Sequence, residues 1–179
     1  HLGDRYLKRP ETGWSELQNL EPPTVSNDSM YIMRLSSSAN STFYFDTYKE
    51  NDSIFPIRYS RLINGKHEEP KALPKAINTG TFLSHPFIAP DESYLLFDAK
   101  REDGFGDSDI YISFKQNEGT WGNAINLGDK INTDAWEASA SITPDGKYLF
   151  FSRNVGSDKY ENVDIFWVDA KIVFDLKTK

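Results

Sequence analysis

Two segments of the chain share one pattern of apolar and polar positions. Residues 87–98 read FIAPDESYLLFD, residues 141–152 read SITPDGKYLFFS, and the two align without a gap. In both, Pro-Asp predicts a tight turn, because proline fixes φ and the aspartate side chain bonds back to the backbone. After the turn, YLLF at 94–97 and YLFF at 148–151 show no alternation of polar and apolar residues, which favours a strand buried on both faces.

The repetition extends beyond this hairpin. GTWGNAINLGDKINT at 119–133 matches GKHEEPKALPKAINT at 65–79, and a looser copy, GWSELQNLEPPTVS, lies at 13–26. Each full unit predicts four short strands, of which the third is a segment such as DIYISF. Units of about 50 residues with four strands, each covered on both faces by its neighbours, are typical of propeller blades. A β-sandwich is the main alternative, but it would not need the same sequence at a fixed period.

The repeat resembles a known family. SITPDGKYLFFSRN followed by DIFWVD is similar to the β-propeller repeat of the TolB type, a relative of the WD repeats. GFGDSDIYISF and GTWGNAINLGDKINT resemble the bacterial six-bladed propellers that are often found in the periplasm, free or fused to other domains. The resemblance runs from about residue 12 to residue 172. It implies a fold and a periplasmic or extracellular location, but not an activity.

The predicted blades do not complete a ring. Residues 1–25 predict the end of a blade, 26–80 and 81–135 predict two full repeats, and 136–179 predict a last repeat with a C-terminal helix. Asp169 is the predicted N-cap of that helix. We expect the missing blades to come from a longer parent chain or from a second copy, unless the exposed faces are capped with help from the helix.

Composition narrows the function classes. The chain of 179 residues has a net charge of −7 and contains no cysteine. The acidic balance disfavours nucleic-acid binding, and the lack of cysteine excludes disulfides and Cys nucleophiles. No apolar run approaches the length of a membrane span. No G-x-S-x-G, H-E-x-x-H, P-loop or G-x-G-x-x-G motif occurs in the sequence.

Four side chains are candidates for a ligand site near the mouth of the propeller channel. His85 lies just before the turn of the middle repeat, Trp136 and Glu137 open the last repeat, and Arg34 aligns with Pro86. Such a polar and aromatic set could bind a sugar or a peptide. It could equally serve interblade hydrogen bonds and packing.

The Gly-rich segment DGFGDSD at 103–109 is a weak calcium candidate. Calcium favours several oxygen ligands on a flexible turn, although the spacing is not the EF-hand pattern. The last aspartate begins a strand and is repeated by Asp164, which favours a structural role. His67, which replaces the strand-four Trp, is also expected to be structural. The calcium candidates are Asp103, Asp107 and Asp109.

The sequence therefore predicts an all-β chain of about three propeller blades, each of four antiparallel strands, with a short C-terminal helix. The predicted function is a non-catalytic binding or scaffold module for a protein, a peptide or a glycan, with calcium as the only candidate cofactor. The alternative is a part of a propeller enzyme, either carbohydrate-active or the gating domain of a serine peptidase.

Overall fold

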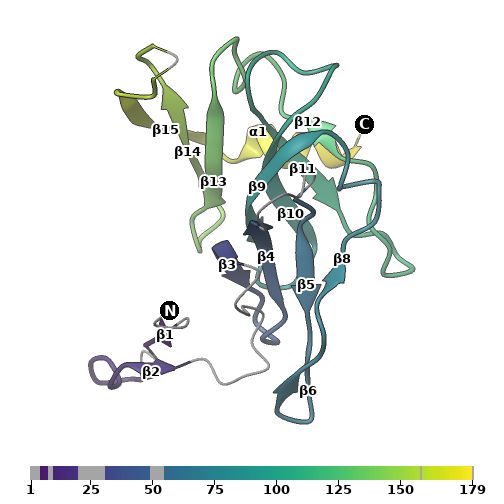
Figure 1. Ribbon diagram of the computed structural model, residues 1–179, viewed down its shortest axis with the longest axis vertical. Helices are drawn as coiled ribbons and strands as arrows, with labels where there is room; N and C mark the ends of the chain where they lie inside the picture. Colours follow the sequence, from purple (N-terminus) through teal and green to yellow (C-terminus); the bar gives the residue numbers. More distant parts are fainter. Residues whose placement is uncertain (1–4, 8–9, 20–30, 49–54, 158, 179) are drawn as a thin grey trace.

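The strands form three large antiparallel sheets that lie side by side as propeller blades (Figure 1). The computed structural model describes the chain except for residues 1–4, 8–9, 20–30, 49–54, 158 and 179. Helical structure in the described residues is confined to α1 (Lys171–Phe174) and the 3-10 turn η1 (Asp175–Thr178). The predicted all-β propeller fold with a short C-terminal helix is confirmed.

The blades follow one another along the chain, and each runs outward from its first strand. Blade 1 consists of β3 (Tyr31–Ser37), β4 (Phe43–Tyr48), β5 (Arg58–Ser60) and β8 (Lys71–Ala72). Blade 2 consists of β9 (Thr81–Ile88), β10 (Tyr94–Lys100), β11 (Asp109–Phe114) and β12 (Ile125–Asn126). Blade 3 consists of β13 (Glu137–Ile142), β14 (Tyr148–Asn154) and β15 (Val163–Asp169).

Two short hairpins complete the strands. β6 (Leu62–Ile63) pairs with β7 (Lys66–His67), and the His67 ring stacks on Phe43 at 4.0 Å between centroids. His67 is therefore a packing residue of blade 1. Near the N-terminus, β1 (Arg5–Tyr6) pairs with β2 (Gln18–Asn19) apart from the three blades (Figure 1). That this pair ends a blade remains a prediction.

Each hairpin between the first two strands of a blade is closed in the same way. A side-chain oxygen accepts the backbone N–H two residues further on, which is the mechanism expected of Asp and Asn in turns. Blade 1 lacks the Pro-Asp sequence, and its asparagine takes over this role. The acceptors and donors are Asn40 and Thr42, Asp91 and Ser93, and Asp145 and Lys147.

The middle blade is apolar on both faces, as its sequence predicts. On β10, Leu95 and Phe97 belong to a core shared with blade 1, and Leu96 belongs to a core shared with blade 3. All three side chains are fully buried. Because successive side chains of a strand point to opposite faces, one strand contributes to two interblade cores.

The C-terminal helix begins one residue later than predicted. Ala170 is the N-cap residue and makes no side-chain cap, whereas Asp169 is the last residue of β15. The Asp169 carboxylate still accepts the N–H of Lys171 at 2.8 Å. Val173 is buried in the core between blades 2 and 3, so the helix covers that interface and does not cap the far face of blade 3. None of the described helices is long and apolar enough to cross a membrane.

Candidate functional site

The first strands of the blades carry a bulge at the same point, and His85 lies in it. The strand register shifts between Ile32 and Leu35 in β3 and between Ala138 and Ser141 in β13. His85 has a φ of 49° and Ser139 one of 57°, a region that few residues other than glycine adopt.

Arg34 occupies the position that the sequence alignment predicts. The bulge residues are 33–34 in β3 and 85–86 in β9, so Arg34 corresponds to Pro86.

A buried carboxylate on the second strand of each of the first two blades holds the bulge of the next blade. Asp46 accepts the N–H of His85 at 2.9 Å, and Asp98 accepts the N–H of Ser139 at 3.0 Å. Arg34, in the first of the three bulges, donates its N–H to Asp46 of its own blade at 2.6 Å. These bonds satisfy donors that would otherwise be buried without a partner.

The His85 ring is bound within its own blade. Its Nδ1 lies 3.0 Å from both carboxylate oxygens of Asp98, whose side chain is almost completely buried. Burial alone lowers the pKa of His85, but the hydrogen bond and charge of Asp98 and the charge of Asp46 outweigh it. The net effect raises the pKa of His85, although the charge of Arg34 opposes it. The two carboxylates therefore favour the protonated form of His85.

The stability contribution of His85 should depend on pH. We expect wild type to exceed His85→Asn in stability by about 1–2 kcal/mol at low pH, typical of a hydrogen bond to a charged group. The contribution is full below the unfolded-state pKa of about 6.5 and is lost as pH rises through the raised folded-state pKa. Asn is the replacement because it tolerates positive φ. Urea unfolding at about pH 5.5 and about pH 8.5 measures the change across the range where histidine titrates.

His67→Asn is the matched control for this pH dependence. Burial lowers the pKa of His67, with a hydrogen bond to the Ser60 backbone opposing it. The contribution of His67 should therefore be present at high pH and lost as pH falls, which is the opposite direction. Equal pH profiles for the two variants would contradict the assignment of a His85–Asp98 ion pair.

Glu137 is part of the fold and does not face a cavity. Its carboxylate is fully buried and accepts the Nε–H of Arg153 at 2.7 Å. It also accepts the N–H of Thr133 at 2.9 Å and the Thr133 hydroxyl at 2.5 Å. Glu137 is thus held by contacts within the fold, and its role as a ligand residue stays a prediction.

The aspartates of the loop at 103–109 have separate partners. Asp109 accepts the N–H groups of Phe105 and Gly106 at 2.7 and 3.2 Å, which closes the loop on itself. A Cβ at Gly106 would lie 2.4 Å from the carbonyl oxygen of Thr133, so only glycine fits here. Asp107 accepts the Lys100 ammonium group at 2.7 Å and the Tyr160 hydroxyl.

The calcium hypothesis gains no support from this loop. Among the residues that the structure describes, no three His, Asp or Glu side chains are grouped to hold a metal ion, and this includes Asp103, Asp107 and Asp109. Asp109 already accepts three hydrogen bonds, two from the backbone and one from Asn126 at 2.6 Å. Its role is to shape the loop that packs against the start of blade 3.

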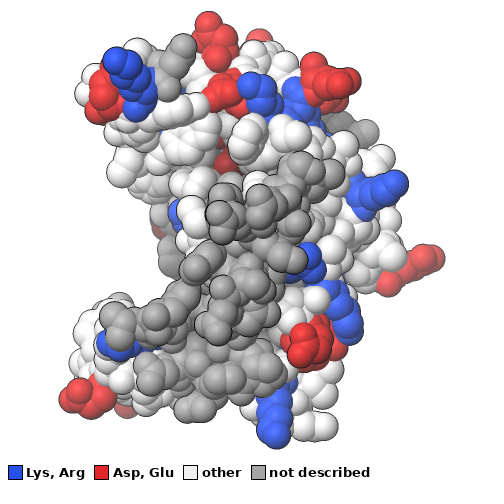
Figure 2. Space-filling model, viewed as in Figure 1, with Lys and Arg blue, Asp and Glu red and all other residues white. Residues whose placement is uncertain are grey.

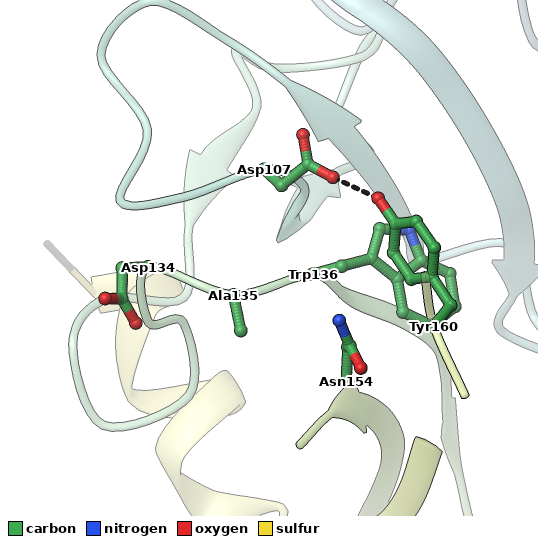
Figure 3. A pocket seen from close by; sticks show the side chains of 6 residues that line it. All are labelled: Asp107, Asp134, Ala135, Trp136, Asn154 and Tyr160. Carbon is green, nitrogen blue, oxygen red and sulfur yellow. Dashed lines mark hydrogen bonds between the residues drawn. The ribbon is translucent and has the colours of Figure 1, made fainter. Parts of the chain in front are cut away.

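A pocket of about 430 Å³ opens where this loop meets blade 3 (Figure 3). The Trp136 and Tyr160 rings stand edge to face with centroids 5.8 Å apart, and the Asp107 carboxylate points to the Tyr160 hydroxyl. Asp134 lies on the opposite side and is exposed. The lining residues are Asp107, Asp134, Ala135, Trp136, Asn154 and Tyr160. The pocket thus combines two carboxylates with two aromatic rings.

Two of the four predicted site residues come together beside this pocket. The His85 ring stands edge to face to Trp136 with centroids 6.3 Å apart, and Trp136 lines the pocket. The charge of Arg34 lowers the pKa of His85, and this is the effect that links Arg34 to the other predicted residues. Sequence reasoning missed Tyr160 and Asp134, which lie in loops between strands where the residue type is not repeated, since Asp134 aligns with Gly80.

Comparisons with known proteins support the fold. No family model matches the chain, and none of the curated proteins matches it. Among solved structures, TolB from Acinetobacter baumannii matches 81% of this chain at 18% identity with a TM-score of 0.50. A structure from the analysis of two prolyl endopeptidases matches 89% of it at 15% identity with a TM-score of 0.53. The chain spans only 31% and 23% of the length of the respective proteins.

Proposed function

We propose that this chain is a non-catalytic binding module of a propeller, and that it recognises a protein or peptide segment through a cationic group. The observation that carries this proposal is the pocket beside Trp136, where two carboxylates and two aromatic rings line one space (Figure 3). A lysine, an arginine or a free amino terminus has the chemistry that fits it.

The aromatic rings and the carboxylates act on the same kind of ligand group. A cation over the face of Trp136 or Tyr160 is attracted by the ring electrons, and the contact strengthens as water is excluded. Asp134 is exposed and Asp107 lies beside Tyr160, so both add negative charge to the pocket wall. Lys100, which donates to Asp107 at 2.7 Å, would be displaced or shared when a second cation enters.

The charge of the whole chain favours the same ligand. A net charge of −7 attracts basic segments and raises their rate of association at low salt. On the face shown in Figure 2, Lys and Arg are interspersed with Asp and Glu among the described residues. Local selection of a cation therefore depends on the pocket and not on one large acidic surface.

A titration with small cationic probes tests the proposal. We expect arginine amide and lysine amide to change the Trp136 fluorescence, and we expect Asp134→Asn to weaken this binding about threefold to tenfold, as for loss of one partly exposed ion pair. The uncharged norleucine amide should not bind. Trp14→Phe serves as a control because Trp14 is exposed and lies outside the pocket. Binding of a neutral disaccharide in place of the amides would assign the pocket to a glycan and overturn this proposal.

A second candidate is a part of a propeller enzyme, and the likeness to the prolyl endopeptidases is the observation that favours it. For a gating domain of a serine peptidase, the parent gene should encode an α/β-hydrolase domain in addition to the propeller. For a carbohydrate-active propeller, a soaked sugar should lie between two carboxylates. Turnover of a substrate that is abolished by Trp136→Ala would favour this candidate over the binding module.

We place the protein in the periplasm or outside the cell. The resemblance to bacterial propellers that are often periplasmic supports this placement, as does the likeness to TolB. The lack of cysteine is compatible with an oxidising compartment.

A further inference from the structure

A second pocket, with a volume of about 360 Å³, opens between blades 1 and 2. Three aromatic rings line it, those of Tyr44 and Tyr59 from blade 1 and that of Trp121 from the segment between β11 and β12. The side chains of Arg61 and Lys115 also line it. We call this space the interblade pocket. It shares no lining residue with the pocket described above.

At the interface between blades 2 and 3, the equivalent positions belong to a packed core. The buried aspartate that bonds to the next blade lies two residues after Tyr44 in blade 1 and two residues after Leu96 in blade 2. Tyr44 pairs with Tyr59 on the neighbouring strand, as Leu96 pairs with Ile112. Two tyrosines therefore stand where the next interface has a leucine and an isoleucine, both fully buried.

Arg61 is equivalent to an aromatic residue of the next blade. One residue after these strand pairs, Ser60 and Ser113 each donate the hydroxyl to a backbone carbonyl of the returning chain, at 2.5 and 2.7 Å. Arg61 and Phe114 come next in the sequence. Phe114 packs against the core between blades 2 and 3, which Val173 of the C-terminal helix also enters. A guanidinium group therefore takes the place of a ring that packs against a core.

The difference leaves an open space where the next interface is closed. Between blades 2 and 3, apolar side chains fill the equivalent space, and such a core needs no hydrogen-bond partners. Between blades 1 and 2, two tyrosine rings and a guanidinium group line a cavity of the size typical of small-molecule sites. A largely aromatic wall with a few polar groups is also the usual composition of such a site.

The unpaired charge in the interblade pocket is that of Arg61. Its guanidinium carbon lies 5.3 Å from the Tyr59 ring centroid, and its side chain forms no hydrogen bond or ion pair with a described residue. Lys115, in contrast, donates to Glu92 at 2.5 Å, and the other oxygen of Glu92 accepts the Ser38 hydroxyl at 3.0 Å. No Asp or Glu is among the described residues that line the pocket. An anionic ligand group is therefore attracted by Arg61 without competition from a carboxylate in the wall.

The rings determine which kind of anion fits. Tyr44 and Tyr59 stack with centroids 6.1 Å apart, and Trp121 stands edge to face to Tyr44 at 6.2 Å. These contacts hold the rings in place, while Tyr59 and Trp121 are only half-buried and present free surface to the pocket. A ligand ring packs against such rings in stacked or edge-to-face geometry. A carboxylate binds a guanidinium group through two parallel hydrogen bonds.

We propose that the interblade pocket binds a carboxylate that is joined to an aromatic ring by a short linker. The carboxylate binds Arg61, and the ring packs against Tyr59 and Trp121. Two sources offer this chemistry, a free aromatic acid and the carboxyl terminus of a peptide that ends in phenylalanine or tyrosine. The ligand charge is opposite to that expected for the pocket beside Trp136, and this inference does not depend on the function proposed for that pocket.

Isothermal titration calorimetry with the full chain tests the site. The probes are hydrocinnamate, which represents a free aromatic acid, and N-acetyl-phenylalanine, which represents a peptide carboxyl terminus. We expect Arg61→Gln to weaken the binding of both about tenfold to a hundredfold, as for the loss of a hydrogen bond between charged groups. Acetate, which has no ring, and N-acetyl-phenylalanine amide, which has no carboxylate, should bind more weakly than either acid.

Lys66→Gln is the matched control, because Lys66 is an exposed cation of the neighbouring β6–β7 hairpin that does not line the pocket. It should change the affinity less than about threefold, since exposed charges outside the site are largely screened by salt. Arg61 is exposed as well. Neither substitution should therefore change the midpoint of urea unfolding.

The relative affinities of the probes identify the source of the ligand. Tighter binding of hydrocinnamate assigns the site to a free aromatic acid, and tighter binding of N-acetyl-phenylalanine assigns it to a peptide carboxyl terminus. If neither acid binds, or if Arg61→Gln binds both as tightly as wild type, the proposal is overturned. Tighter binding of glucuronate than of both acids would assign the pocket to an acidic glycan and would also overturn it.

Discussion

Glu137→Ala should destabilise the fold by about 3–5 kcal/mol, the cost of removing one partner of a buried ion pair. The substitution leaves the Arg153 guanidinium and the Thr133 N–H without their acceptor at the base of blade 3. This loss is a large part of the free energy of unfolding of an ordinary domain, which is about 5–15 kcal/mol. Urea unfolding followed by tryptophan fluorescence measures it.

Glu118→Ala is the control for removing a glutamate carboxylate as such, because Glu118 is exposed in the turn between β11 and β12. It should change the stability by less than about 0.5 kcal/mol. If Glu137→Ala instead retains full stability and loses binding of the cationic probes, Glu137 is a ligand residue as the sequence suggested. The burial of its carboxylate argues for the structural outcome.

Leu96→Ala and Phe97→Ala should each cost about 3–5 kcal/mol, as expected for truncation of fully buried Leu and Phe side chains. The two residues are adjacent on β10 but belong to different cores, Leu96 between blades 2 and 3 and Phe97 between blades 1 and 2. Two neighbouring substitutions thus weaken two separate interfaces. Urea or thermal unfolding of the two single variants measures both effects.

Phe105→Ala is the control for these core substitutions, since Phe105 is about half exposed in the loop before β11. Its cost should stay below about 1 kcal/mol, as for substitutions outside the core. A small effect of one β10 substitution together with a large effect of the other would mean that only one of the two interblade cores stabilises the chain.

The fold could be predicted because it rests on local patterns that recur. The apolar run of β10 indicated burial on both faces, and the structure confirms two cores on either side of it. The Pro-Asp sequence indicated the hairpins of blades 2 and 3, whereas blade 1 lacks it and Asn40 replaces the aspartate there. The helix start was off by one residue because β15 stays extended through Asp169.

The candidate site could be predicted only in part. Trp136 and His85 lie near each other, as their grouping in the sequence analysis predicted, because the first strands of blades 2 and 3 are neighbours. That Glu137 binds a ligand stays a prediction. Its partner Arg153 comes from the next strand, and a sequence does not show such pairing. Arg34 corresponds to Pro86 in the structure as it does in the sequence alignment, because each is the second residue of the bulge in its strand.

The repeat did not reveal the pocket. Tyr160 lies in the segment 155–162 between β14 and β15, and Asp107 lies in the equivalent segment 101–108 between β10 and β11. The two segments have the same length but different sequences, so the repeat does not show that these side chains meet. What brings them together is the close packing of the loop at Gly106 against the carbonyl of Thr133.

A buried aspartate of one blade accepts a hydrogen bond from the next blade, so one sequence repeat is not the unit that folds by itself. A fragment cut between blades 1 and 2 would contain every strand of its sheet and still lack half of each cross-blade bond. The buried Asp46 carboxylate would lose the His85 N–H, and the strained bulge at His85 would lose its acceptor. A single blade of this protein is therefore a poor candidate for an autonomous domain, and dissection or recombination of such chains should preserve pairs of neighbouring blades.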